Sequence, residues 1–127
     1  MKVFDASAVL ALLKQEPGAE KVVAHMADDD DLWVSAVNFS EVVSTLVERG
    51  IKEAEVLRAW QQLALHTEPL NAEVSLRAAR LRPVTRHLGL SLGARCCLAL
   101  AQAHSATVVT ADRPWRDLPG FDIALIR

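Results

Sequence analysis

The chain has 127 residues, of which 51% are hydrophobic and 24% are charged. This composition is typical of a single folded domain over residues 1–127 and excludes a disordered chain. No apolar run approaches the roughly 20 residues that a membrane-spanning helix needs. An aspartate interrupts the apolar start of the chain, so we expect neither a membrane protein nor a signal peptide.

The charges and the cysteines are unevenly distributed. Residues 1–76 carry six basic and 13 acidic side chains, whereas residues 77–127 carry eight basic and three acidic ones. The basic half could contact phosphates or could simply be a solvated surface. The only cysteines, Cys96 and Cys97, are adjacent. Neighbours on a helix point in different directions, so we expect no disulfide framework and a reducing, cytoplasmic location.

Short apolar segments alternate with helical patterns along the whole chain. The pattern predicts strands at residues 2–5, 32–37, 66–70, 106–112 and 121–126. It predicts helices at residues 7–14, 19–26, 39–49, 52–65, 71–82 and 93–104. Such alternation is typical of parallel crossovers, so we predict a three-layer α/β/α sandwich with a mainly parallel central sheet.

Three acidic side chains follow predicted strands. Asp5 ends the first strand, Asp112 comes just after the fourth, and Glu41 lies in the first turn of the helix after the second. Functional residues of parallel sheets gather at the carboxyl ends of the strands, so we expect these acids to lie together. Carboxylates held close together repel each other unless a cation lies among them. The sequence therefore predicts a site for Mg²⁺ or Mn²⁺, which oxygen ligands favour.

Each acid also has a purely structural interpretation. Asp5 could cap the first predicted helix, and Asp112 could form an Asx turn. Asn38 and Glu41 have the spacing of a capping box. We favour the metal site because all three acids belong to the same edge of one sheet.

Four sequence blocks carry a family resemblance that covers essentially the whole chain. They are D-A-S-A at residues 5–8, S-E-V at 40–42, L-S-L-G at 90–93 and T-A-D-R-P-W at 110–115. In order and spacing these blocks resemble the PIN-domain ribonucleases, specifically the VapC-type toxins of bacterial toxin–antitoxin pairs. The resemblance implies a Mg²⁺- or Mn²⁺-dependent enzyme that hydrolyses RNA phosphodiesters.

The resemblance also implies roles for individual residues. It makes Asp5 the central metal ligand, with Glu41 and Asp112 binding the metal directly or through water. It gives two hydroxyls, Ser7 and Thr110, the task of orienting metal or water. The fourth acid of the family belongs immediately after the glycine of L-S-L-G, where this chain has Ala94. Whether Ala94 is an engineered or a natural replacement, we therefore expect this chain to be an inactive or weakened ribonuclease.

The implied partners are RNA, a VapB-like antitoxin and a second copy of the chain in a homodimer. The antitoxins of this family often place a basic group in the acidic pocket. Apolar helical stripes at residues 42–50 and 56–65 could receive a partner or could face the core. For RNA we expect phosphate contacts from four arginines, of which the last two should lie nearest the acidic pocket: Arg82, Arg86, Arg95 and Arg113.

Two other functions stay open. A phosphorylation-dependent receiver domain has a similar length and an acidic Mg²⁺ pocket, but it needs an acidic pair after the first strand and a late lysine. This chain has one acid there, and all four lysines lie at or before Lys52. A non-enzymatic PIN-like module that binds RNA or protein would be compatible with Ala94. RNA turnover with Mn²⁺, compared with binding alone, distinguishes this module from the ribonuclease.

Overall fold

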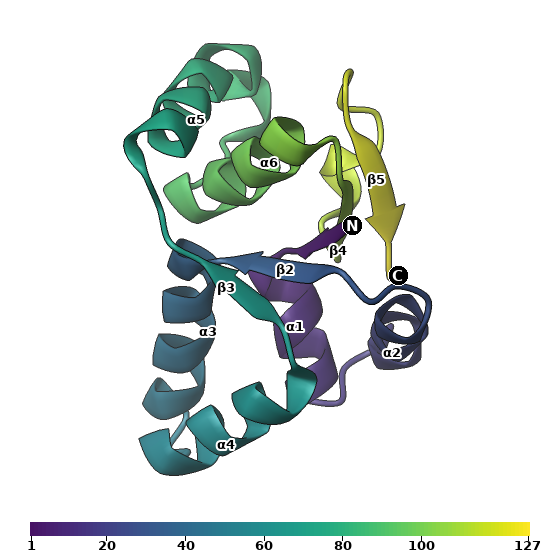
Figure 1. Ribbon diagram of the computed structural model, residues 1–127, viewed down its shortest axis with the longest axis vertical. Helices are drawn as coiled ribbons and strands as arrows, with labels where there is room; N and C mark the ends of the chain where they lie inside the picture. The colour runs from purple at the N-terminus through teal and green to yellow at the C-terminus, as the bar shows by residue number, and fades with distance from the viewer.

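Five parallel strands form one sheet in the order β3-β2-β1-β4-β5 (Figure 1). The computed structural model describes all residues, 1–127. The strands are β1 (Lys2–Phe4), β2 (Leu32–Ser35), β3 (His66–Glu68), β4 (Thr107–Thr110) and β5 (Asp122–Leu125). Strands β2 and β3 lie in succession on one side of β1, and the chain then crosses over to place β4 and β5 on the other side of β1. The carboxyl ends of β1 and β4 therefore flank the switch point, where open parallel sheets bind their ligands.

Six helices cover the two faces of this sheet. They are α1 (Ala6–Leu13), α2 (Ala19–Ala27), α3 (Ala36–Glu48), α4 (Glu53–Leu63), α5 (Ala72–Val84) and α6 (Leu92–His104). Two single turns of 3-10 helix, η1 (Arg86–Leu88) and η2 (Arg113–Trp115), follow α5 and β4. Helices α5 and α6 lie on one face of the sheet, and α1 to α4 lie on the other (Figure 1). The predicted three-layer α/β/α sandwich is confirmed, and the sheet is wholly parallel.

Alternate residues of the strands divide the core into two halves. Val3 and Val108 pack toward α5 and α6, whereas Phe4 and Val109 pack toward α1 to α4, because successive strand residues point to opposite faces. Helix α6 is buried from Gly93 to Ala101. As a crossover helix it runs back along the sheet into β4, so its first turn lies at the carboxyl ends of the strands.

Two further expectations can be compared with the structure. Both cysteines are free and buried, which agrees with the absence of a disulfide framework. None of the helices combines the length and apolar character that crossing a bilayer requires.

The junction between β2 and α3 differs from the prediction. The strand predicted over residues 32–37 ends at Ser35, and α3 begins at Ala36 rather than at residue 39. Ser35 caps the helix, because its hydroxyl accepts a hydrogen bond from the backbone N–H of Val37 (3.2 Å). Glu41 consequently lies in the second turn of α3 and not in the first.

Candidate active site

Asp5 directly follows β1 and is buried, with 4% of its surface exposed. Its backbone N–H donates to the carbonyl of Val109 (2.9 Å), which continues the pairing of β1 with β4. It occupies the N-cap position of α1, but its side chain makes no capping hydrogen bond. Its Oδ2 instead accepts hydrogen bonds from Ser7 Oγ (2.7 Å) and Thr110 Oγ1 (3.0 Å). The alternative interpretation of Asp5 as a helix cap is therefore wrong.

The two hydroxyls connect the ends of β1 and β4. Ser7 Oγ lies 3.2 Å from Thr110 Oγ1 and accepts a hydrogen bond from the Ala111 N–H (2.9 Å). Thr110 Oγ1 accepts one from the Asp112 N–H (3.0 Å), which fixes the turn that carries this acid. Asp112 itself is exposed and does not cap η2. The hydroxyls thus hold Asp5 and the Asp112 turn together, and their expected action on metal or water stays a prediction.

The negative charge of Asp5 is unfavourable in the chain alone. Its pKa is raised to about 6, mainly by burial. Hydrogen bonds from Ser7 and Thr110 lower this pKa, whereas the charges of Asp112 and Glu41 raise it further. The three acids are therefore within electrostatic range of one another, and a cation among them would remove this cost.

Asn38 and Gly93 position Glu41. Asn38 is fully buried, and its Nδ2 donates to Glu41 Oε2 (3.1 Å) and to the Gly93 carbonyl on α6 (3.1 Å). It is the third residue of α3, so the capping-box interpretation of Asn38 and Glu41 is wrong. A Cβ atom at Gly93 would overlap the Glu41 carboxylate, so glycine is needed for that carboxylate to keep its present position. This role of Asn38 was not predicted from the sequence, although its spacing of three from Glu41 places both residues on one helix face.

Ala94 lies in the first turn of α6, directly after Gly93, which borders the Glu41 carboxylate. Ser91 caps the helix by accepting a hydrogen bond from the Ala94 N–H (3.1 Å). Cys97 follows three residues later on the same face. Burial raises the pKa of the Cys97 thiol well above its usual range, and the charges of the three acids raise it further. The methyl group of Ala94, with 9% of the residue exposed, thus lies on the side of α6 that borders the acidic site.

The donor atoms of this site fit a hard divalent cation in kind but not in number. Carboxylate oxygens are the ligands that Mg²⁺ and Mn²⁺ prefer. However, no group of three or more His, Cys, Asp or Glu side chains is spaced to hold a metal ion. The three acids share one electrostatic environment without forming a complete set of ligands.

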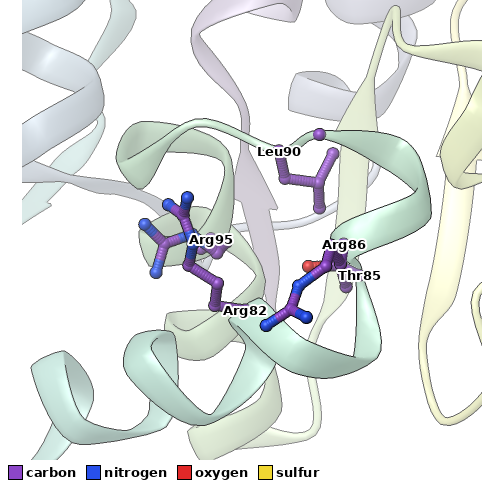
Figure 2. Close-up of a pocket in the computed structure, with 6 residues that line it drawn as sticks. Arg82, Thr85, Arg86, Leu90 and Arg95 are labelled. Atoms are coloured by element: carbon purple, nitrogen blue, oxygen red, sulfur yellow. The ribbon is translucent and has the colours of Figure 1, made fainter.

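The four arginines expected to contact phosphate lie in two places. Arg113 is exposed and directly follows Asp112. Arg95 is buried, and its Nη1 donates to the Ala78 carbonyl on α5 (3.0 Å) instead of reaching the acids. Its side chain lines a separate pocket together with Arg82 and Arg86 (Figure 2). The expectation that Arg95 lies beside the acidic pocket is thus wrong for its guanidinium group.

The sequence matches the family model of the PIN domain over residues 2–120. The chain therefore belongs to the PIN domain family, and the receiver-domain alternative is wrong. None of the curated proteins matches the chain significantly in sequence.

Similar solved structures include three from bacteria. A toxin–antitoxin complex from Klebsiella pneumoniae has a TM-score of 0.77 at 19% identity, covering 100% of this chain and 98% of that one. FitAcB from Neisseria gonorrhoeae has a TM-score of 0.73 at 21% identity, with coverages of 99% and 98%. VapBC2 from Rickettsia felis, bound to a DNA fragment from its promoter, has a TM-score of 0.74 at 15% identity, with coverages of 98% and 97%. These likenesses show that the whole chain has the same fold as these proteins.

Proposed function

We propose that this chain is the VapC-like toxin of a toxin–antitoxin pair, with a Mg²⁺- or Mn²⁺-dependent ribonuclease site that Ala94 weakens. The observation that carries the proposal is the buried carboxyl of Asp5, which lies at the end of β1 beside the switch point of the sheet, within electrostatic range of Glu41 and Asp112. Membership of the PIN domain family supports it. Further support comes from a solved structure of the same fold, the toxin–antitoxin complex from Klebsiella pneumoniae.

In the proposed reaction, Asp5 is the central ligand, and Glu41 and Asp112 bind the ion directly or through water. A bound divalent ion supplies Lewis acidity toward the phosphate and the attacking water. Ser7 and Thr110 both donate to Oδ2 of Asp5, which leaves Oδ1 free for the cation. Asn38 holds Oε2 of Glu41, so that this carboxylate is oriented before the ion arrives.

The weakened activity follows from the ligand count. Ala94 contributes no oxygen, and the remaining acids do not form a group of three that is spaced for a metal ion. A carboxylate at position 94 would project from the first turn of α6, where the helix dipole favours an anion by about 0.3–1 kcal/mol. It would complete the ligand set on the side that borders the acids.

RNA cleavage by the Ala94→Asp variant tests this proposal. In the presence of Mn²⁺, we expect the variant to cut total bacterial RNA at least about 100-fold faster than the native chain. Losing a single contact to the transition state typically changes a rate by this factor. A chelator should stop the cleavage, because the reaction needs the cation. The matched control is Ala94→Asn, which has the same shape without the charge and should stay at the native rate.

Two results would contradict the proposal in different ways. Full-rate cleavage by the native chain would mean that position 94 needs no ligand. A variant that is inert on every RNA would favour the non-enzymatic PIN-like module that binds RNA or protein.

The proposed partner is a VapB-like antitoxin that binds with one amphipathic helix. The apolar stripes of the sequence face mostly inward, since Val42, Leu46 and Trp60 belong to the core. An apolar groove of about 560 Å³ remains between α1, α2 and α4, with Val23 and Met26 in its lining. Such grooves accept the apolar face of a helix.

Co-purification with the protein encoded beside this chain tests the antitoxin proposal. Size measurement of the chain alone tests the expected homodimer. A strictly monomeric chain with no such partner would contradict both.

A further inference from the structure

A second pocket, here called the arginine pocket, lies where α5 ends and α6 begins (Figure 2). Its volume is about 170 Å³, and six residues line it: Arg82, Thr85, Arg86, Gly89, Leu90 and Arg95. No acidic side chain is among them. None of the three arginines forms a salt bridge, because the ion pairs of the structure all involve other residues. The pocket therefore carries positive charge that the chain itself does not neutralise.

Arg95 makes this pocket unusual, since only 7% of the residue is exposed. Its Nη1 donates to the Ala78 carbonyl, but its Nε is buried without any hydrogen-bond partner. A buried charge without a charged partner is unfavourable, and a buried donor without an acceptor adds to the cost. An anion from outside the chain would supply the missing negative charge.

We propose that the arginine pocket binds a phosphate group and that RNA delivers it. The planar guanidinium group matches the oxygens of phosphate in a bidentate manner. The pocket is smaller than the roughly 300–1,000 Å³ of sites for drug-sized ligands, so a small anion fits it better than a whole nucleotide.

The position of the pocket points to RNA. Arg95 directly follows Ala94 in the sequence, so the arginine pocket and the acidic site lie on two sides of the same helical turn. An RNA strand with one phosphate at the acids could extend past this turn and present another phosphate to the arginines. Only this choice of RNA as the source rests on the proposed function; the phosphate chemistry does not.

RNA binding without cleavage tests the inference. Binding of a fluorescent single-stranded RNA is measured by anisotropy, in chelator and at several salt concentrations. Arg82 and Arg86 are exposed, so the double variant Arg82→Gln/Arg86→Gln should fold normally. We expect its affinity to fall about tenfold and its salt dependence, log K against log[salt], to flatten by about 0.7 for the lost phosphate contact.

The matched control removes two exposed arginines elsewhere, on α4 and at the end of α3: Arg49→Gln/Arg58→Gln. It changes the net charge equally and should keep the affinity within about twofold of the native value. An equal loss of affinity in both variants would overturn the proposal, because the arginines of the pocket would then act only through net charge.

A second measurement distinguishes the two sources of phosphate. Inorganic phosphate and a nucleoside monophosphate are each added to the native chain and to Arg82→Gln/Arg86→Gln, and thermal unfolding is followed. Stabilisation by phosphate that disappears in the variant, together with weakened RNA binding, supports the proposal. If the variant loses the stabilisation by phosphate but still binds RNA normally, the pocket binds free phosphate. The proposal that RNA is the source of the phosphate would then be overturned.

Two further outcomes would overturn the proposal itself. One is a variant that matches the native chain in both measurements. The other is a variant that loses only the binding of an acidic co-purified protein, which would make the pocket a protein interface. RNA binding in chelator needs no cleavage, so an inert Ala94→Asp variant would overturn the proposed function and leave this inference standing.

Discussion

The acidic site and the arginine pocket flank the same turn of α6 and carry opposite charges. Each contains one buried charged residue, Asp5 in the first and Arg95 in the second, and neither residue is paired with an opposite charge inside the chain. They differ in how the charge can be relieved. The carboxyl of Asp5, with its pKa raised to about 6, can take up a proton or a cation. Guanidinium groups do not lose their proton in proteins, so the arginine pocket can only take up an anion.

The sign of an unpaired buried charge therefore indicates which kind of ligand a site can bind. At the acidic site, pH and divalent ions are expected to compete, because both neutralise the same carboxylate. At the arginine pocket only anions are expected to act. The two regions can therefore be tested separately, although Ala94 and Arg95 are adjacent residues.

Asp5→Asn should produce the largest change in stability. The pKa of Asp5 is about 6 in the folded chain against an ordinary value of 3.8, so the folded state binds more protons between these values. The free energy of unfolding of the native chain therefore falls as the pH rises through this range. Asparagine keeps an oxygen for the Ser7 and Thr110 hydroxyls without the charge. Without divalent ions, the variant should be more stable than the native chain by up to about 3 kcal/mol near pH 8 and by about zero near pH 4.

Urea unfolding in chelator across this pH range measures the effect. Asp30→Asn, at an exposed acid in the turn before β2, is the matched control and should show no such pH-dependent gain. A destabilised Asp5→Asn variant near pH 8 would mean that the chain already compensates the charge of Asp5. The comparison of the two regions would then fail on the acidic side.

Asn38→Ala should have the next largest effect. It removes the hydrogen bonds of Asn38 to the Gly93 carbonyl and to the Glu41 carboxylate, which together contribute about 1–3 kcal/mol. The free energy of unfolding should fall by that amount in urea titrations. Gln61→Ala, at an exposed amide on α4, should change it by no more than about 0.5 kcal/mol. Equal free energies of unfolding for the two variants would contradict the role of Asn38 in positioning Glu41.

Gly93→Ala should have the smallest effect on the free energy of unfolding. Its main effect should be on cation binding. The added methyl group displaces the carboxylate of Glu41, which is the flexible end of its side chain, while alanine favours the helix by about 1 kcal/mol. The free energy of unfolding should therefore stay within about 1 kcal/mol of the native value. In the Ala94→Asp background, Mn²⁺ affinity should fall, whereas RNA binding through the arginine pocket should not. Unchanged Mn²⁺ affinity would exclude Glu41 as a ligand.

The sequence was sufficient for the architecture and for the positions of two of the acids. Alternating apolar patterns predicted the parallel sheet, and a parallel sheet brings the ends of β1 and β4 together, which places Asp5 and Asp112 at one edge. The boundary of β2 was wrong because the cap provided by Ser35 overrode an apolar pattern that continued into α3.

The remaining features depend on contacts between distant segments. The contact of Asn38 with Gly93 joins residues 55 positions apart, and no local pattern encodes it. The cluster of arginines was visible in the sequence, but the burial of Arg95 against Ala78 was not. It depends on the packing of α6 against α5, and only this packing distinguishes a pocket from a solvated basic face.

Calorimetric titration of Mn²⁺ into the native chain and into Ala94→Asp most directly tests the claim that the acidic site lacks one ligand. The account predicts that the aspartate variant binds Mn²⁺ about 10–100-fold more tightly than the native chain. Ala94→Asn should bind as the native chain does, and adding Asp5→Asn to the aspartate variant should abolish binding. Equal Mn²⁺ affinities for the native chain and Ala94→Asp would contradict the account, because position 94 would then contribute nothing to a metal site.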